Sequence, residues 1–360
     1  MRKNTKQKII LSLVLVLVMS AVVSCTKNEE MKNSIKDVQK TEEPISIDLE
    51  IIEAIDEAIK WKIKEDEIGE WEIISIQRDM MNIPVVEEDK KDTSSIQKNK
   101  IDIQKIHKDR MNILESYLDE FKKVVEENKG EFEDVNDYSR LLLTATALGL
   151  DGKDVLGYNF VEKIYSDGNL VGEFTSTAAY GLIALDSKGY SIPEGENWTR
   201  QEIVEWLLSI QNEDGGFGYE EGADSDVDMT AMVLQSLSNY QDKEDVKEAT
   251  DKALNYISEN QEEDGGFITW DEDTSETVSQ TIIALTSLGI DPKEDERFIK
   301  EGNLVDKLVS FKEEDGGFLH TYGEGNESDG FATEQALRGL VAYNRFTQGR
   351  RHYYDMDDVE

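Results

Sequence analysis

The chain has 360 residues and a formal net charge of −39, from 39 basic and 78 acidic side chains. This length suits one large domain or two modest ones, and a hydrophobic share of 38% can supply a core. A surface this acidic repels the phosphates of nucleic acids and of anionic lipid headgroups. Nucleic-acid binding is therefore excluded.

The first 24 residues have the pattern of an export signal. An apolar run from Ile9 to Val23 follows a basic start made by Arg2, Lys3, Lys6 and Lys8. The run has about 15 residues, which is short for a membrane-spanning helix of roughly 20. We therefore expect residues 1–24 to be removed on export.

The predicted signal ends in Val22-Val23-Ser24-Cys25, which resembles the lipobox of bacterial lipoproteins. The resemblance implies that Cys25, the chain's single cysteine, becomes an acylated N-terminus. Its acyl chains would anchor the protein to the extracytoplasmic face of a bacterial cell membrane. An ordinary signal peptide is the alternative. Residues 25–47 are polar and are expected to form a disordered tether.

Residues 48–360 are predicted to form one helical domain. Apolar residues recur there at spacings of three and four, the period of an amphipathic helix. The exceptions are a polar surface loop expected at 87–100 and the segment GGFITW at 265–270, which has a weak strand signal. The expected helices are 48–63, 68–82, 106–128, 134–149, 156–166, 174–187, 199–211, 227–240, 245–260, 274–289, 302–313 and 331–346. They make six consecutive pairs.

An internal repeat relates these pairs. QNEDGGF begins at Gln211, QEEDGGF at Gln261 and KEEDGGF at Lys312, at spacings of 50 and 51 residues. Each copy follows an apolar helix and precedes a second helix rich in small residues. Asp-Gly-Gly supplies positive φ angles for a tight stop, after which the phenylalanine returns to the core. Such pairs, closed on themselves with the small-residue helices inside, form an α/α toroid.

The repeat carries a family resemblance. Lys252–Phe267, KALNYISENQEEDGGF, resembles the QW repeat of squalene and terpene cyclases, with Phe267 in place of tryptophan. Protein prenyltransferase β subunits share that toroid, as does the N-terminal domain of the cobalamin carriers intrinsic factor and transcobalamin. The resemblance implies an all-α (α/α)6 toroid over residues 48–360.

The segment DSDVDMTAMVLQSL, Asp224–Leu237, is most similar to exported bacterial members that resemble the cobalamin carriers. In those carriers the ligand lies between the toroid and a following β domain. The chain ends at Glu360, soon after the last expected helix. Cobalamin therefore stays an open ligand rather than an expected cofactor, and no other cofactor is implied.

An acid is the first candidate site. Squalene-hopene cyclases carry Asp-x-Asp-Asp-Thr-Ala, whose middle aspartate protonates an alkene, and this chain reads DVDMTA from Asp226. By that resemblance Asp228 matches the proton donor and Asp226 the first aspartate. Met229 replaces the last carboxylate, whereas alkene protonation needs a strong acid with supporting neighbours. The architectural alternative makes Asp226 an N-cap and Asp228 a first-turn residue favoured by the helix dipole.

Metal sites are not expected. Protein prenyltransferases bind zinc through Asp, Cys and His, but Cys25 is assigned to the lipid anchor and the three histidines have no ligand spacing (His107, His320 and His352). Asp224, Asp226 and Asp228 alternate like the start of an EF-hand loop. That loop needs glycine and glutamate at its sixth and twelfth positions, which are methionine and glutamine here.

A ligand cavity at one mouth of the toroid is the remaining candidate. The inner helices begin there, and aromatic rings with a few convergent polar groups are typical of small-molecule sites. The alternative is turn packing with solvated acids. A neutral or cationic, partly apolar ligand would fit the charge. The expected lining is Phe217, Tyr219, Asp226, Asp228, Phe267, Trp270, Glu276, Phe318, His320, Tyr322 and Asp329.

The sequence thus predicts a lipid-anchored α/α toroid that binds a small ligand or an envelope protein or glycan. The first alternative is an enzyme of terpene-cyclase or prenyltransferase type with Asp228 as general acid. The second is a protein-interaction scaffold. A protonated Asp228 beside a deep apolar cavity would favour the enzyme.

Overall fold

The computed structural model describes residues 48–80, 103–269, 272–323 and 325–360. The chain divides into two units, Met1–Ser46 and Ile47–Glu360, and all the described residues belong to the second. The predicted signal, Cys25 and tether lie outside the described residues, as do the loop predicted at 87–100 and Trp270. Within the described ranges, no helix is long and apolar enough to cross a membrane.

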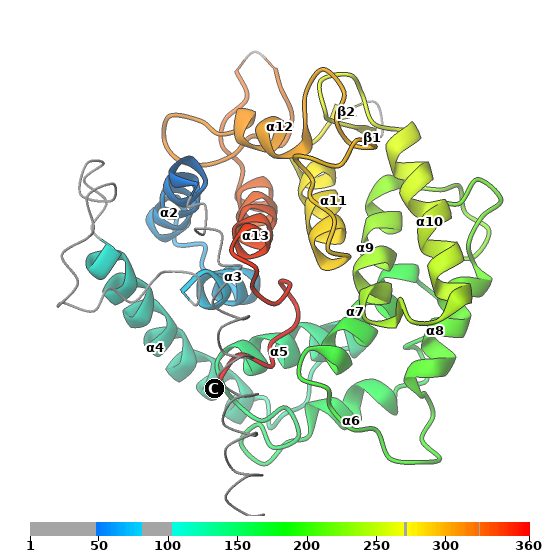
Figure 1. Ribbon diagram of the computed structural model, residues 1–360. Coiled ribbons are helices and arrows are strands. Elements are labelled where there is room, and N and C mark those ends of the chain that lie inside the picture. Colours follow the sequence, from blue (N-terminus) through cyan, green and yellow to red (C-terminus); the bar gives the residue numbers. More distant parts are fainter. Residues whose placement is uncertain (1–47, 81–102, 270–271, 324) are drawn as a thin grey trace, which may run out of the picture. The chain divides into compact units, whose positions relative to one another are not determined.

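Six helices of the described unit form a closed inner ring (Figure 1). Each contacts the next in chain order, and the last contacts the first. They are α3 (Glu70–Met80), α5 (Val135–Ala147), α7 (Thr175–Asp186), α9 (Val227–Leu237), α11 (Ser275–Ser287) and α13 (Gly330–Thr347).

Six outer helices alternate with them along the chain, and each packs mainly on one inner helix. They are α2 (Leu49–Lys64) on α13, α4 (Ile103–Glu127) on α3, α6 (Phe160–Tyr165) on α5, α8 (Arg200–Ser209) on α7, α10 (Glu244–Glu259) on α9 and α12 (Leu304–Ser310) on α11. This arrangement confirms the predicted all-α (α/α)6 toroid.

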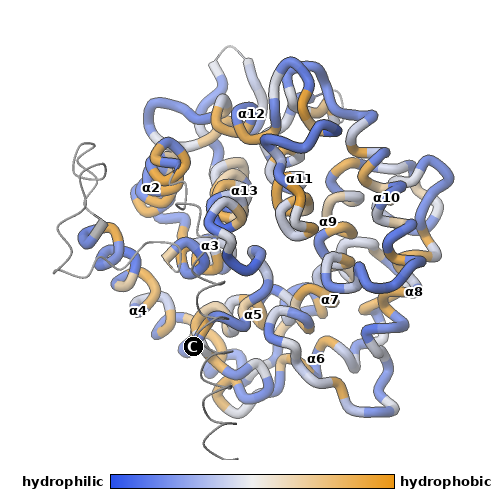
Figure 2. The backbone as a smooth tube through the Cα atoms, viewed as in Figure 1, coloured by the Kyte–Doolittle hydropathy of each residue, from blue (hydrophilic) through white to orange (hydrophobic). Residues whose placement is uncertain are grey.

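Burial explains which helices lie inside. Every residue of α11 from Ser275 to Thr286 is buried, as expected of a helix with neighbours on both sides. The outer helix α10 buries only one stripe and exposes its charged residues. Figure 2 shows the hydrophobic stretches within the helices and the hydrophilic ones mainly in the connecting loops.

The repeated turns have the predicted chemistry. Gly215, Gly265 and Gly316 have φ angles of 90°, 94° and 95°, which favour glycine. The phenylalanines that follow them are fully buried: Phe217, Phe267 and Phe318. Gln211 ties its turn to the next outer helix, because its Nε2 donates to the carbonyls of Gly215 and Ala249, both at 2.8 Å. The turns therefore link successive pairs.

Local structure departs from the prediction at α6 and at one hairpin. Helix α6 begins at Phe160 rather than 156, because Val155 and Tyr158 form a bridge around Leu156, whose φ is 55°. The weak strand signal near Ile268 corresponds to a short hairpin of β1 (Ile268–Thr269) and β2 (Glu272–Asp273). This hairpin lies directly before α11.

The C-terminal segment 348–360 closes the end of the ring at which the inner helices finish. Met356 N–H donates to the carbonyl of Ser187, the C-cap of α7, at 2.7 Å. Asp358 forms ion pairs with Arg78 of α3 and Arg345 of α13. Tyr353 is fully buried, with its hydroxyl 2.7 Å from Ser75 Oγ. The sequence analysis assigned no role to this segment.

Candidate functional site

The opposite end of the ring, where the inner helices begin, holds the candidate site; we call it the N-terminal mouth. Four buried or partly buried carboxylates lie in the first two turns of inner helices. They are Glu72 of α3, Asp228 of α9, Glu276 of α11 and Glu334 of α13. Buried acidic groups are costly unless they are neutralised or paired, so each requires a physical explanation.

The DVDMTA segment combines architecture with one residue that architecture does not explain. Asp226 is the N-cap of α9 and accepts from Met229 N–H at 3.0 Å, while Thr230 Oγ1 accepts from Phe217 N–H at 2.9 Å. The same two roles recur at α13, in Asp329 and Thr333. The position of Asp228 is taken there by Phe331, so the repeat does not require an aspartate.

The surroundings of Asp228 stabilise its carboxylate poorly. Its Oδ2 accepts from Thr277 Oγ1 at 3.2 Å, whereas Oδ1 is out of contact with solvent and has no hydrogen-bond partner. Burial raises the pKa of Asp228 to about 7, and the neighbouring charges of Asp226 and Glu276 add to the effect. A carboxylic acid that is substantially protonated near neutral pH is the result.

Glu276 is paired with His320. Glu276 Oε1 lies 2.8 Å from His320 Nδ1, and His320 Nε2 lies 3.1 Å from Oε2 of Glu272. Burial opposes the charged imidazolium, but the hydrogen bonds and charges of the two glutamates outweigh it and raise the pKa of His320. His320 therefore gives both glutamates a hydrogen-bond partner on this side of the N-terminal mouth.

Glu334 and Glu72 also have cationic partners. Arg338 Nη1 donates to Glu334 Oε1 at 3.2 Å, and Lys62 Nζ lies 2.8 Å from Glu72 Oε1. Burial still raises the pKa of Glu334 to about 7, with Arg338 opposing that rise and Glu72 adding to it.

The wall below the carboxylates is polar. Gln235 Nε2 donates to Gln280 Oε1 at 2.8 Å, and Gln280 Nε2 donates to Gln335 Oε1 at 2.7 Å. This chain of buried amides joins α9, α11 and α13. Below it, the Arg338 guanidinium lies over the Trp71 ring at 4.2 Å and donates to the Tyr180 and Tyr354 hydroxyls. These buried groups largely satisfy one another, so the interior of the ring is a hydrogen-bonded network rather than an apolar cavity.

Exposed apolar side chains stand beside the carboxylates. Phe331 is 61% exposed, and Tyr219 and Ile268 are each 54% exposed. Tyr219 packs on Phe174, the N-cap of α7, with 4.8 Å between the ring centroids. Phe331 lies in the first turn of α13, Tyr219 in the loop before α9, and Ile268 in the hairpin before α11. All three therefore border the N-terminal mouth.

The structure brings Asp226, Asp228, Glu276 and His320 together but separates four other predicted residues from them: Phe217, Phe267, Phe318 and Tyr322. Phe267 and Phe318 are fully buried in the core. Phe217 is fully buried in the core and cannot reach a ligand. Tyr322 stacks on Phe311 at 4.3 Å and has Lys307 of α12 over its ring at 4.9 Å, so it packs on an outer helix. Asp329 is an exposed N-cap.

Sequence reasoning missed the polar inner wall. Its members are Trp71, Tyr180, Gln235, Gln280, Gln335, Glu334 and Arg338. A signal was present in ATEQALRGLVAY, where a glutamate and an arginine stand four residues apart in an otherwise small and apolar helix. Within the described ranges, no group of three His, Cys, Asp or Glu side chains is placed to hold a metal ion.

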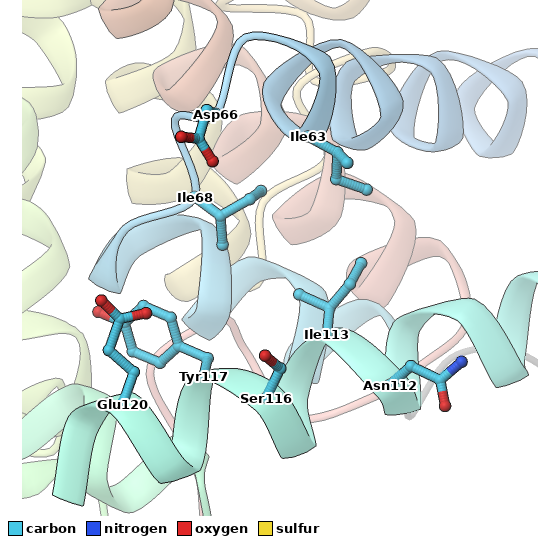
Figure 3. Close-up of a pocket in the computed structure, with 8 residues that line it drawn as sticks. All are labelled: Ile63, Asp66, Ile68, Asn112, Ile113, Ser116, Tyr117 and Glu120. Atoms are coloured by element: carbon cyan, nitrogen blue, oxygen red, sulfur yellow. The ribbon is translucent and has the colours of Figure 1, made fainter. Parts of the chain in front are cut away.

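Two surface grooves lie elsewhere, among the outer helices. One, of about 490 Å³, lies between α4 and the α2–α3 turn, where Ile63, Ile68, Ile113 and Tyr117 face one another (Figure 3). The other, of about 500 Å³, is bordered by Trp61 and by acidic residues of the Asp315 turn. Neither includes a residue that the sequence analysis assigned to a site.

Comparison with known proteins agrees with this architecture. A family model described as prenyltransferase alpha-alpha toroid domain matches residues 173–356, which include α7, α9, α11 and α13. Drimenyl diphosphate synthase of Streptomyces showdoensis is 27% identical over 160 residues, which cover 44% of this chain and 29% of that protein. The match thus spans less than a third of that relative. The chain belongs to the prenyltransferase α/α toroid domain family.

Proposed function

We propose that the protein is an extracytoplasmic lipoprotein whose toroid binds a small ligand at the N-terminal mouth. One observation carries the binding proposal: Asp228 Oδ1 is buried without a hydrogen-bond partner at a position where the structural repeat does not require an acid. A buried acceptor of this kind calls for an explanation, and we take an absent ligand donor as that explanation. The exposed aromatic side chains beside it supply contact area.

The polar inner wall supports a ligand with hydrogen-bonding groups. The amide chain of Gln235, Gln280 and Gln335 and the buried guanidinium of Arg338 form that wall. A polar small molecule or a glycan fragment fits it better than a long hydrocarbon chain does. The strongly negative chain also favours neutral or cationic ligands over anions.

The test is native mass spectrometry of the full chain, purified in detergent and incubated with an envelope extract of the source bacterium. We expect a discrete added mass from a bound ligand, and we expect Asp228→Asn to bind that ligand at least tenfold more weakly. Asp224→Asn is the matched control, because it removes the same charge from an exposed residue of the loop just before α9. A chain that stays empty, or a mass unaffected by Asp228→Asn, would contradict the proposal and favour a protein-interaction scaffold.

The lipid anchor needs its own test. We expect the mature N-terminal peptide to begin at Cys25 and to carry the mass of its acyl chains. Cys25→Ala should release the protein from the membrane fraction into the soluble exported fraction. An unmodified cysteine in the membrane-free fraction of the unaltered protein would contradict the anchor.

An enzyme of terpene-cyclase type is the second candidate, with Asp228 as general acid. Its support is the pKa of Asp228, raised to about 7 by burial, together with the likeness to drimenyl diphosphate synthase. A protonated carboxyl group can donate to a substrate. Incubation with an isoprenoid diphosphate, followed by product analysis, tests it. Turnover that disappears in Asp228→Asn would establish this candidate, and its absence would exclude that substrate class.

A further inference from the structure

Of the four carboxylates of the N-terminal mouth, three have a basic side chain as a partner. Glu276 lies against His320, Glu334 against Arg338 and Glu72 against Lys62, with the nearest nitrogen and oxygen atoms 2.8 to 3.2 Å apart. Among the described residues, Asp228 takes part in no ion pair. The protein supplies a basic side chain at three of the four positions and none at the fourth.

The surroundings of Asp228 do not compensate for the missing cation. The hydroxyl of Thr277 is neutral, and the charged groups nearest to Asp228 are the carboxylates of Asp226 and Glu276. Breaking or omitting one half of a buried ion pair is strongly destabilising, because the remaining charge has neither water nor a partner. Selection for stability alone would place an uncharged residue here.

A second unpartnered acceptor lies on the same face of α9. Gln235 is 2% exposed, and its Oε1 has no hydrogen-bond partner although its Nε2 is fully engaged. Seven residues separate it from Asp228, which is two helical turns and places both on one side of the helix. Both positions need hydrogen-bond donors.

Aromatic rings lie at the start of the neighbouring inner helix α7. Helix α7 neighbours α9 in the ring, and its N-cap Phe174 packs with Tyr219, whose ring is half exposed. Aromatic faces attract cations as well as apolar groups. A carboxylate oxygen that lacks a donor, on a helix next to exposed aromatic rings, is suited to an organic cation.

We propose that the ligand carries a primary ammonium group, which binds Asp228 Oδ1 and takes the place that His320, Arg338 and Lys62 occupy at the other carboxylates. An ammonium group has three donors, so it can serve Asp228 while its other hydrogens meet water or neighbouring acceptors. This inference rests on the proposed ligand binding at the N-terminal mouth and specifies its chemistry.

The experiment uses isothermal titration calorimetry on the full chain in detergent at pH 8. The probes are tyramine, which has an aromatic ring and an ammonium group, and tyrosol, in which a hydroxyl replaces the amine. We expect tyramine to bind at least tenfold more tightly than tyrosol, and Asp228→Asn to abolish that difference. Asp224→Asn should leave both affinities within twofold, which controls for the loss of one negative charge.

Two outcomes would overturn the inference. Either tyramine binds no better than tyrosol, or its advantage survives in Asp228→Asn. Failure of the proposed function is distinguishable, because it shows as an empty chain after incubation with envelope extract. A neutral ligand captured from the extract in an Asp228-dependent way would refute the ammonium group and leave the binding proposal standing.

Discussion

The two ends of the ring treat buried charge in opposite ways. At the end closed by the C-terminal segment, Asp358 is held between Arg78 and Arg345, which lower its pKa against the opposing effect of burial. At the N-terminal mouth, Asp228 has no cation and its pKa rises to about 7. The closed end also buries Tyr353, while the mouth exposes Tyr219.

This contrast separates structural from functional demands within one fold. Pairing charges and burying aromatic rings stabilises the closed end, where Asp358 has two cationic partners and Tyr353 is fully buried. The mouth retains an unpaired acid and exposed rings, which lower stability or solubility without a ligand. Changes at the closed end should therefore reduce stability, and changes at the mouth should alter binding.

The largest expected effect is at the closed end. Tyr353→Ala removes a fully buried ring and its hydroxyl contact with Ser75. We expect a loss of about 3–5 kcal/mol in the free energy of unfolding, measured by chemical denaturation. Tyr219→Ala at the mouth is the matched control and should cost less than about 1 kcal/mol, because its ring is half exposed. Equal costs would remove the contrast.

Asp358→Asn comes next. It leaves Arg78 and Arg345 without their shared carboxylate, so we expect a loss of about 3 kcal/mol at pH 7. The folded pKa of Asp358 is depressed, so its contribution is present above the unfolded pKa of about 3.9 and is lost as pH falls through the folded value. A variant as stable as the parent at pH 7 would show that the clamp contributes nothing.

Asp228→Asn should raise the free energy of unfolding rather than lower it. The folded pKa of Asp228 is raised, so the native acid is favoured below pH 4 and becomes destabilising as pH rises towards 7. We expect Asp228→Asn to stabilise the protein by about 2 kcal/mol at pH 8 and to have almost no effect at pH 3.5. Denaturation curves at the two pH values measure this difference. Destabilisation at pH 8 would indicate a structural role for Asp228.

His320→Gln should have the smallest effect. The folded pKa of His320 is raised, so its interaction with Glu276 stabilises the protein below the unfolded pKa of about 6.5 and is lost as pH rises through the folded value. Because the side chain is 48% exposed, we expect a loss of only about 0.5 kcal/mol at pH 5.5 and none at pH 9. A loss that persists at pH 9 would point to packing instead.

The architecture was predictable because local signals agreed. The helical period, the capping box of Thr199 and Glu202, and the glycines of the repeated turns each specify structure within a few residues. The closing segment was not predictable, because Tyr353 and Asp358 reach their partners on α3 only through the closure of the ring. The spacing of apolar residues carries no information on contacts between residues so far apart in the sequence.

The candidate site was predictable in part. Asp228 was found through its motif and Glu276 and His320 through their place before or within an inner helix. The pairing of Glu334 with Arg338, and the lack of a cation at Asp228, depend on which side chains meet across the ring. Phe217 was misassigned because a residue beside a mouth in sequence can face the core instead.

The central claim is that Asp228 is a partly buried acid, with Oδ1 shielded from solvent, whose cationic partner is missing from the described part of the protein. Carbon-13 NMR titration of its side-chain carboxyl group, assigned with Asp228→Asn, measures the pKa directly. We expect a pKa of about 7 for the free protein and a fall of at least one pH unit with saturating tyramine. A pKa near 4 in the free protein would contradict the claim, because it would show that Asp228 is already stabilised as a carboxylate.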